Sequence, residues 1–300
     1  MTNQAVLVTG AAGDTGGYAI DALAKLNVSV RAMVRKDDER AARLRATGVE
    51  VILADLLDLD SVRSAMEGVS AAYFVYPLVP GLIDATAYFA QAAREAGVRS
   101  IVNMSQISAR RESKSHQARD HWISERVFDW SGVPVTHLRP TFFAQWLTYP
   151  YMRVRRDIAE KGLINLPFGN GRHAPIAAED QARVIAAILA KPAPHSGKTY
   201  NLFGPVEMDW NGIAKAVGDA LGREVIYRPI EIADFIRQLK DNGLPEQTLQ
   251  HLRAVALDFQ EGLFAGTDDV IETITGTPPM TVGSFVEAHR KEFSGRTSDL

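Results

Sequence analysis

The residues with the clearest chemical meaning form a glycine-rich segment near the N-terminus. An apolar run, Ala5–Thr9, leads directly into Gly10-Ala11-Ala12-Gly13-Asp14-Thr15-Gly16, which has the spacing G-x-x-G-x-x-G and opens a helical pattern. In such a loop the first glycine permits a tight turn, the second lets backbone amides approach a phosphate, and the third lets helix and strand pack closely. Because the N-terminus of a helix attracts anions, this segment predicts a site for the pyrophosphate of a dinucleotide.

The end of the next apolar run indicates which dinucleotide binds. In NAD-binding proteins an acidic residue about 20 residues beyond the glycines holds the ribose 2′-hydroxyl, whereas this chain has Arg35 and Lys36 there. A guanidinium and an ammonium suit a 2′-phosphate, so the sequence predicts NADPH. Two alternatives remain: both cations are solvated, or the adjacent Asp37 and Asp38 reach the ribose.

A second acidic position follows the third apolar run. Asp55 and Leu56 stand where the adenine edge of a dinucleotide would lie, although an aspartate there is equally suited to begin a helix.

The composition excludes several other kinds of chemistry. There is no cysteine, so disulfides, thiolate catalysis and Cys-ligated metals are excluded, and neither H-E-x-x-H nor G-x-S-x-G occurs. The 33 basic and 36 acidic residues lack the excess of positive charge that nucleic-acid or membrane-surface binding requires. We therefore expect no metal site, no nucleic-acid partner and no membrane partner, but a small-molecule substrate.

The N-terminal sequence lacks the basic segment of a signal peptide, and the longest uncharged apolar stretch, Ala71–Ile83, is too short to span a bilayer. These features predict a cytoplasmic protein.

The elements that position the glycine loop follow from the alternation of apolar runs with helical spacing. Six strands are expected, at Ala5–Thr9, Val28–Val34, Val49–Leu53, Ala71–Tyr76, Ser100–Met104 and Pro134–Leu138. This pattern predicts an α/β fold with a Rossmann-like, doubly wound parallel sheet. The pattern changes after Pro150, so residues 1–150 are expected to form the dinucleotide-binding domain. Residues 151–300 are expected to form a smaller α/β substrate-binding lobe, with a helix at 179–189 packing back on the first domain.

Several segments in this order resemble a known family. They are Thr9–Gly16, Val30–Arg35, Arg99–Ser105, Ser131–Pro140, Glu179–Ala182 and Thr199–Pro205. Together they resemble the NmrA-like group of atypical short-chain dehydrogenase/reductases over nearly the whole chain. The group includes NADPH-dependent quinone reductases, triphenylmethane-dye reductases and imine reducers, and also redox-sensing regulators that bind the dinucleotide without turnover.

The resemblance implies where the reactive end of the cofactor lies. In similar proteins the nicotinamide is near the ends of the fourth to sixth strands, which implicates Tyr76, Pro77, Ser105 and the segment Pro140–Phe143 of this chain. The resemblance leaves the oligomeric state open between monomer and homodimer.

The chain departs from ordinary short-chain dehydrogenases at their catalytic helix. The Tyr-x-x-x-Lys pair is missing: Gln117 stands in the tyrosine position and His121 in the lysine position. His121–Glu125 instead resembles the H-x-x-T-E run of the quinone and dye reductases, with serine in place of threonine. Reversible alcohol oxidation is therefore disfavoured, but hydride transfer to an electrophile such as a quinone, an iminium or a cationic dye is not.

The candidate catalytic residues are His121 and Ser105. An imidazole titrates near neutrality, so His121 could deliver a proton; its alternative role is to orient a neighbour such as Glu125. Ser105 could contact the nicotinamide amide or the substrate, or bond only to local backbone. Aromatic walls for the substrate are expected from residues just beyond the sixth strand, which could equally form an apolar hinge between lobes: Phe142, Phe143, Trp146, Tyr149 and Tyr151.

Two functions are thus in competition. The first is an NADPH-dependent reductase of small electrophiles, favoured by His121 and the aromatic run. The alternative is a non-catalytic NADP(H) sensor, favoured by the missing tyrosine and lysine.

Overall fold

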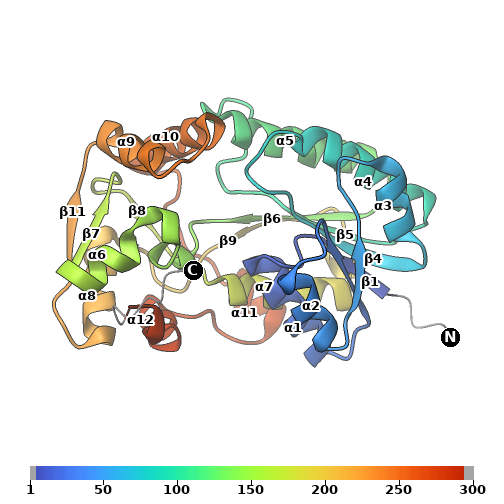
Figure 1. Ribbon diagram of the computed structural model, residues 1–300, viewed down its shortest axis with the longest axis horizontal. Coiled ribbons are helices and arrows are strands. Elements are labelled where there is room, and N and C mark those ends of the chain that lie inside the picture. Colours follow the sequence, from blue (N-terminus) through green and yellow to red (C-terminus); the bar gives the residue numbers. More distant parts are fainter. Residues whose placement is uncertain (1–4, 294–300) are drawn as a thin grey trace.

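A parallel sheet of seven strands forms the larger part of the protein in the computed structural model, which describes residues 5–293. The strand order is β3-β2-β1-β4-β5-β6-β9 (Figure 1). The strands are β1 (Ala5–Val8), β2 (Val30–Val34), β3 (Glu50–Leu53), β4 (Val69–Phe74), β5 (Ile101–Met104), β6 (Val135–Pro140) and β9 (Thr199–Leu202). The order reverses between β1 and β4, which places a crevice at their carboxyl ends. The predicted doubly wound fold is confirmed.

Helices cover both faces of this sheet, as the buried apolar strands require. One face carries α1 (Asp14–Lys25), α2 (Glu39–Ala46), α7 (Ala178–Ala190) and α11 (Val270–Thr275), and the other carries α3 (Leu59–Met66), α4 (Leu82–Glu95) and α5 (His116–Trp130) (Figure 1). Polar side chains start several of them: Asp38 caps α2, Asp58 caps α3, and Ser115 caps α5.

A smaller lobe follows the sixth strand. It contains the pairs β7 (Leu163–Leu166) with β11 (Ile226–Pro229) and β8 (Arg172–His173) with β10 (Met208–Asp209). Its helices are α6 (Val154–Lys161), α8 (Trp210–Leu221), α9 (Ile232–Asp241), α10 (Glu246–Gln260) and α12 (Val282–Ala288). Short 3₁₀ turns complete the chain: η1 (Ala144–Leu147), η2 (Pro150–Met152), η3 (Ala193–His195) and η4 (Arg290–Phe293).

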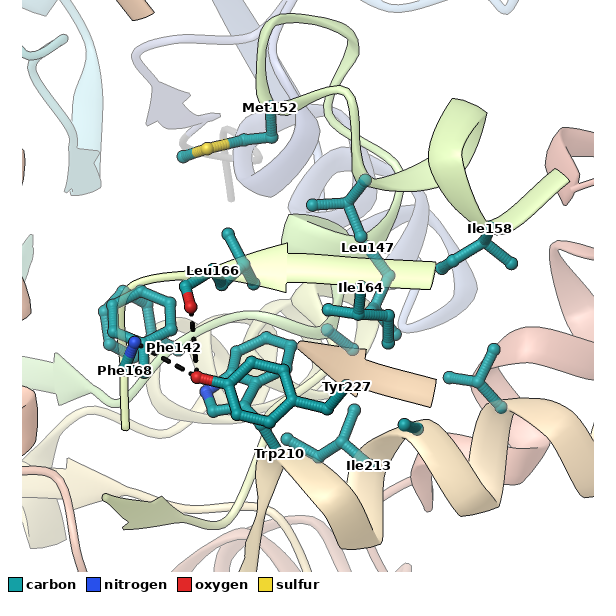
Figure 2. Packing of buried hydrophobic residues seen from close by; sticks show 14 of the residues in the cluster. Phe142, Leu147, Met152, Ile158, Ile164, Leu166, Phe168, Trp210, Ile213 and Tyr227 are labelled. Atoms are coloured by element: carbon teal, nitrogen blue, oxygen red, sulfur yellow. Dashed lines mark hydrogen bonds between the residues drawn. The ribbon is translucent and has the colours of Figure 1, made fainter. Parts of the chain in front are cut away.

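Aromatic and aliphatic side chains fill the core of the smaller lobe. Figure 2 shows Phe142, Phe168 and Trp210 in this cluster, with the Tyr227 hydroxyl donating to the Leu166 carbonyl at 3.0 Å and accepting from the Phe168 amide at 3.2 Å. The buried phenol therefore has both partners that its burial demands.

The chain crosses between the two parts more than once after residue 150. Strand β9 pairs with β6 at the edge of the main sheet, and α7 packs along α1. The expected lobe of residues 151–300 allowed for a helix at 179–189 but not for this returning strand. We therefore propose the two-lobe division with β9, α7 and α11 assigned to the first lobe.

Helix α10 fastens the smaller lobe to the N-terminus of α5 (Figure 1). The Ser115 Oγ and His251 Nδ1 atoms are 2.7 Å apart, and the Arg110 guanidinium binds the buried Asp258 carboxylate at 2.6 Å. These contacts hold α10 against the loop after β5 and against the first turn of α5. Within residues 5–293, no helix has the length and apolar character needed to cross a bilayer.

Candidate active site

A cavity of about 540 Å³, here named the loop cavity, lies along the carboxyl ends of β1 to β4. Nine of the residues predicted to bind the cofactor line it: Gly10, Gly13, Thr15, Arg35, Lys36, Asp55, Leu56, Tyr76 and Pro77. Asp14, Gly16, Ser105 and Phe143 do not. The structure thus brings together residues from four separate strand ends, at the position where open α/β sheets bind ligands.

The glycines of the loop leave no room for side chains where the backbone must turn. Gly10 has φ +58°, and a Cβ there would lie 2.5 Å from Cγ1 of Val75. A Cβ on Gly16 would overlap the Gly10 carbonyl, which explains why Gly16 supports the loop from behind instead of lining the cavity. At Gly13, the N-cap of α1, a Cβ would meet only the Gly10 oxygen at 3.3 Å. Glycine is therefore required at positions 10 and 16 because neighbouring atoms pack closely against them. Gly13 instead lines the loop cavity.

Thr9 is a part of this site that sequence reasoning did not single out. Its hydroxyl donates to the Val75 carbonyl at 3.1 Å and accepts from the Val75 amide at 2.8 Å. This exchange ties the end of β1 to the end of β4 across the reversal in strand order. Its position directly before the glycines was the available signal.

The cationic end of the loop cavity has the arrangement expected for a 2′-phosphate. Arg35 and Lys36 line the cavity, and in the described part of the chain neither makes a hydrogen bond or ion pair. Their acidic rivals are already engaged. Asp38 caps α2 and pairs with Arg40 at 2.7 Å, and Asp37 pairs with Arg45 at 2.6 Å. An anionic ligand at this end of the cavity would therefore meet two cations that no neighbouring acidic side chain pairs with among the described residues.

Two loops form the side of the cavity where the sequence predicts the adenine. Asp55 accepts from the Leu57 amide at 2.9 Å, and its own amide donates to the Ser61 hydroxyl at 2.9 Å. Asp55 is thus fixed in a turn, and Asp58 is the residue that caps the helix. The Tyr76 hydroxyl donates to the Pro80 carbonyl at 2.8 Å, which fixes the loop after β4.

Ser105, directly after β5, is held by a buried carboxylate. Its hydroxyl donates to Glu125 Oε1 at 2.6 Å, and Arg139 binds both oxygens of the same carboxylate at 2.8 and 2.5 Å. Burial by itself would raise the pKa of Glu125, but the hydrogen bonds from Arg139 and Ser105 outweigh it and lower that pKa. An ionised carboxylate only accepts, so the single proton of Ser105 is committed to Glu125. The Ser105 hydroxyl is therefore not available as a donor to a ligand.

His121 and Gln117 lie on the same buried face of α5, one turn apart. His121 is 5% exposed, and burial lowers its pKa to about 4. The sequence-based expectation that His121 titrates near neutrality is therefore wrong, because the charged form is poorly solvated there. No hydrogen bond joins His121 to Glu125. The Nδ1 atom of His121 and the Nε2 atom of Gln117 have no hydrogen-bond partner among the described residues. The buried Thr141 hydroxyl, directly after β6, also lacks a partner there.

The aromatic residues just beyond β6 have different surroundings. Phe142 is buried among Trp146, Phe168 and Phe264, with ring centroids 4.3 to 5.2 Å apart, which matches the apolar-hinge alternative for this residue. Phe143 begins η1 and pairs through its backbone with Ile176.

The remaining two aromatic residues, Tyr149 and Tyr151, stack on each other with ring centroids 5.4 Å apart. Burial, and to a smaller extent the charge of Asp14, raises the pKa of Tyr151 to about 12. For Asp14 itself, burial and the carboxylates of Glu179 and Glu292 raise the pKa.

A metal would require a cluster of acidic or imidazole ligands. Among residues 5–293, no group of three or more such side chains is placed to hold one.

The chain belongs to the NmrA-like family, whose model matches residues 2–278. It is 30% identical to an NAD(P)H azoreductase from Xenophilus azovorans over 290 residues, which cover 96% of this chain and 99% of the relative. Its fold is similar to that of the NADPH-dependent quinone oxidoreductase of Escherichia coli complexed with NADPH, with a TM-score of 0.83, 26% identity and coverage of 95% and 99% of the two chains. It is also similar to the Citrobacter sp. triphenylmethane reductase complexed with NADP(H), with a TM-score of 0.82, 26% identity and coverage of 94% and 99%.

Proposed function

We propose that this protein is an NADPH-dependent reductase that transfers hydride to a small electrophilic acceptor, such as a quinone, an azo compound or a dye-like aromatic. The observation that carries the proposal is the loop cavity, in which unpaired Arg35 and Lys36 face the space above the glycine loop. The three relatives named above are all reductases, and two have structures with NADPH or NADP(H).

The residues of the cavity suit the 2′-phosphate, the pyrophosphate and the adenine of the cofactor. Arg35 and Lys36 would bind the 2′-phosphate, the amides of the loop at Gly13 the pyrophosphate, and Asp55 and Leu56 would border the adenine. Bound NADPH supplies the hydride. Ser105 would offer an acceptor at the end of β5, where the nicotinamide end is expected, to an N–H group of a ligand.

The side chains around this end favour acceptors that are already electrophilic. Where alcohol dehydrogenases keep an acidic tyrosine beside a lysine, this chain has the neutral amide of Gln117 and a His121 that stays neutral at pH 7. Neither is a strong proton donor. Apolar and aromatic surroundings can still position a planar substrate and exclude water, which is sufficient for hydride transfer to a quinone or a cationic dye.

The test is the oxidation of NADPH, followed at its absorbance maximum, with a panel containing a benzoquinone, an azo dye and a triphenylmethane dye. We expect turnover with at least one of them. Tight NADPH binding without turnover of any acceptor would favour the non-catalytic sensor instead.

We expect Arg35→Ala to weaken NADPH about 10- to 100-fold and to leave NADH nearly unchanged, because one charge-assisted contact to the 2′-phosphate is removed. Calorimetric titration of both dinucleotides measures this difference. Arg40→Ala is the matched control, since Arg40 lines the same cavity but is already paired with Asp38. Equal losses for NADPH and NADH in Arg35→Ala would contradict the assignment.

A further inference from the structure

The buried face of α5 carries a polar group whose orientation is fixed but whose donor is unused. Gln117 is 1% exposed, and its Nε2 has no hydrogen-bond partner among residues 5–293. Its Oε1 accepts from Gln247 Nε2 of α10 at 3.0 Å. Because the oxygen is occupied by this bond, the amide hydrogens of Gln117 point elsewhere. A buried donor without an acceptor is unfavourable, so such an atom indicates a place for a ligand acceptor.

Several further contacts hold α10 in register above α5 and so keep Gln247 next to Gln117. Gln250 accepts from the His116 amide at 3.1 Å and donates to the Lys114 carbonyl at 2.8 Å. His251 meets the Ser115 hydroxyl at 2.7 Å. Three positions of α10 thus fix the first turn of α5, immediately beside Gln117.

The same face of α5 leads to the expected site of hydride transfer. Glu125, two turns beyond Gln117, binds the Ser105 hydroxyl at the end of β5. With a rise of about 1.5 Å per residue, Gln117 stands roughly 12 Å from Glu125 toward the N-terminus of α5, where its side chain meets Gln247 of α10. The unpartnered Thr141 hydroxyl follows β6, the neighbour of β5 in the sheet. Unused polar atoms therefore gather on the elements that flank Ser105.

We propose that Gln117 is a substrate-selecting residue that donates a hydrogen bond to the carbonyl oxygen of a quinone, and that Gln247 is the positioning residue that keeps it in the donor orientation. This inference rests on the proposed reductase function and adds the substrate class. A cationic triphenylmethane dye accepts hydride at carbon and has no oxygen there, so it cannot use this donor.

The N–H group of Gln117 would stabilise negative charge on the quinone oxygen and would not transfer its proton. In the reaction the quinone gains two electrons and one proton as hydride, and then a second proton from water, and becomes a hydroquinone, while the dinucleotide is oxidised to NADP⁺. Negative charge grows on the quinone oxygen before the second proton arrives. A fixed N–H at that oxygen stabilises the charge without reorganising, and loss of such a donor lowers the rate markedly.

The experiment compares kcat/KM for p-benzoquinone and for crystal violet in the full-length protein with saturating NADPH. Gln117→Met keeps the length of the side chain and removes its hydrogen bonds. For this variant we expect kcat/KM for the quinone to fall about tenfold or more, mainly through kcat, and kcat/KM for the dye to stay within about twofold of the parent. Gln247→Met should lower the quinone value selectively but less, because Gln117 is then free to turn.

Two further variants keep the inference falsifiable. Gln250→Met weakens the contact between α5 and α10 but leaves Gln117 and its partner Gln247 unchanged. The values of kcat/KM for the quinone and for the dye should therefore change by the same factor. If Gln117→Met does not fold, Gln117→Leu, which has no hydrogen-bonding group, must show the selective loss.

The opposite results would overturn the inference. A quinone-to-dye ratio in the Gln117 variants equal to that of the parent overturns it while leaving the reductase function intact. A parent that reduces neither acceptor overturns the proposed function and this inference together.

Discussion

Gly13→Val is expected to abolish dinucleotide binding, by more than about 100-fold in affinity, in a protein that remains folded. Gly13 has φ −101° and ψ 176°, which any residue adopts, and a Cβ there meets only the Gly10 oxygen at 3.3 Å. The fold therefore tolerates the side chain with a shift of a few tenths of an ångström. The branched side chain would instead fill the loop cavity where the pyrophosphate must approach the backbone. Calorimetric titration with NADPH, together with circular dichroism, measures both halves of the expectation.

The neighbouring glycines supply the controls for this variant. A Cβ on Gly17 would lie 3.8 Å from the Ala11 carbonyl, an ordinary contact, so Gly17→Ala should bind normally and stabilise α1 by up to about 1 kcal/mol. Gly16→Ala should instead unfold or distort the loop, because its Cβ overlaps backbone. A folded Gly13→Val protein with the affinity of the parent would show that the loop does not hold the cofactor.

Stability is expected to fall steeply as the pH drops below about 6.5, well before most carboxylates titrate. Burial lowers the pKa of His121 to about 4 and the pKa values of His173 and His251 to about 3. In the unfolded chain these imidazoles take up protons near 6.5, so acid favours unfolding. Each neutral histidine contributes stability that is present above pH 6.5 and is lost progressively as the pH falls toward 4. The loss is on the order of 1 kcal/mol per pH unit for each.

Urea unfolding at pH 7.5 and at pH 5.0 tests this expectation. His251→Asn keeps an oxygen that can accept from Ser115 but cannot titrate, so it should reduce the difference between the two pH values. His116→Asn, at an exposed position of α5, should not. A parent protein equally stable at both pH values would contradict the burial of neutral imidazoles.

The pKa of His289 is shifted in the opposite direction, upward. Burial tends to lower the pKa of His289, but its hydrogen bonds to Glu292 and Glu179, both at 2.9 Å, outweigh burial and raise the pKa. Its contribution to stability is therefore complete below about pH 6.5 and is lost as the pH rises through the folded pKa. This group partly offsets the acid sensitivity.

The sheet and the anion-binding loop could be predicted because their signals are local. Each of the six expected strands is an apolar run, and Gly10, Gly13 and Gly16 lie within one loop and the first turn of α1. The placement of Arg35 followed from counting along one strand. Such features depend on backbone geometry and on neighbours in the sequence.

The parts that were missed depend on contacts between distant segments. The edge strand β9 is a four-residue strand with two exposed residues, and only its pairing with β6 identifies it. The lowered pKa of His121 results from burial under tertiary structure, and Gln247, which contacts Gln117, is 130 positions away. No periodicity in the sequence reports such burial or such a pair.

The return of β9 to the edge of the main sheet ties the order of synthesis to the order of folding. When the first 150 residues have left the ribosome, β6 is still an edge strand with unpaired backbone groups, and the apolar side of α1 lacks α7. The first lobe becomes complete only after α11, which ends at Thr275, has emerged, when every helix of the smaller lobe except α12 has already been made. The nascent chain therefore passes through a long interval in which the edge of β6 and the apolar side of α1 have no native cover, and this is the interval in which aggregation is most favoured.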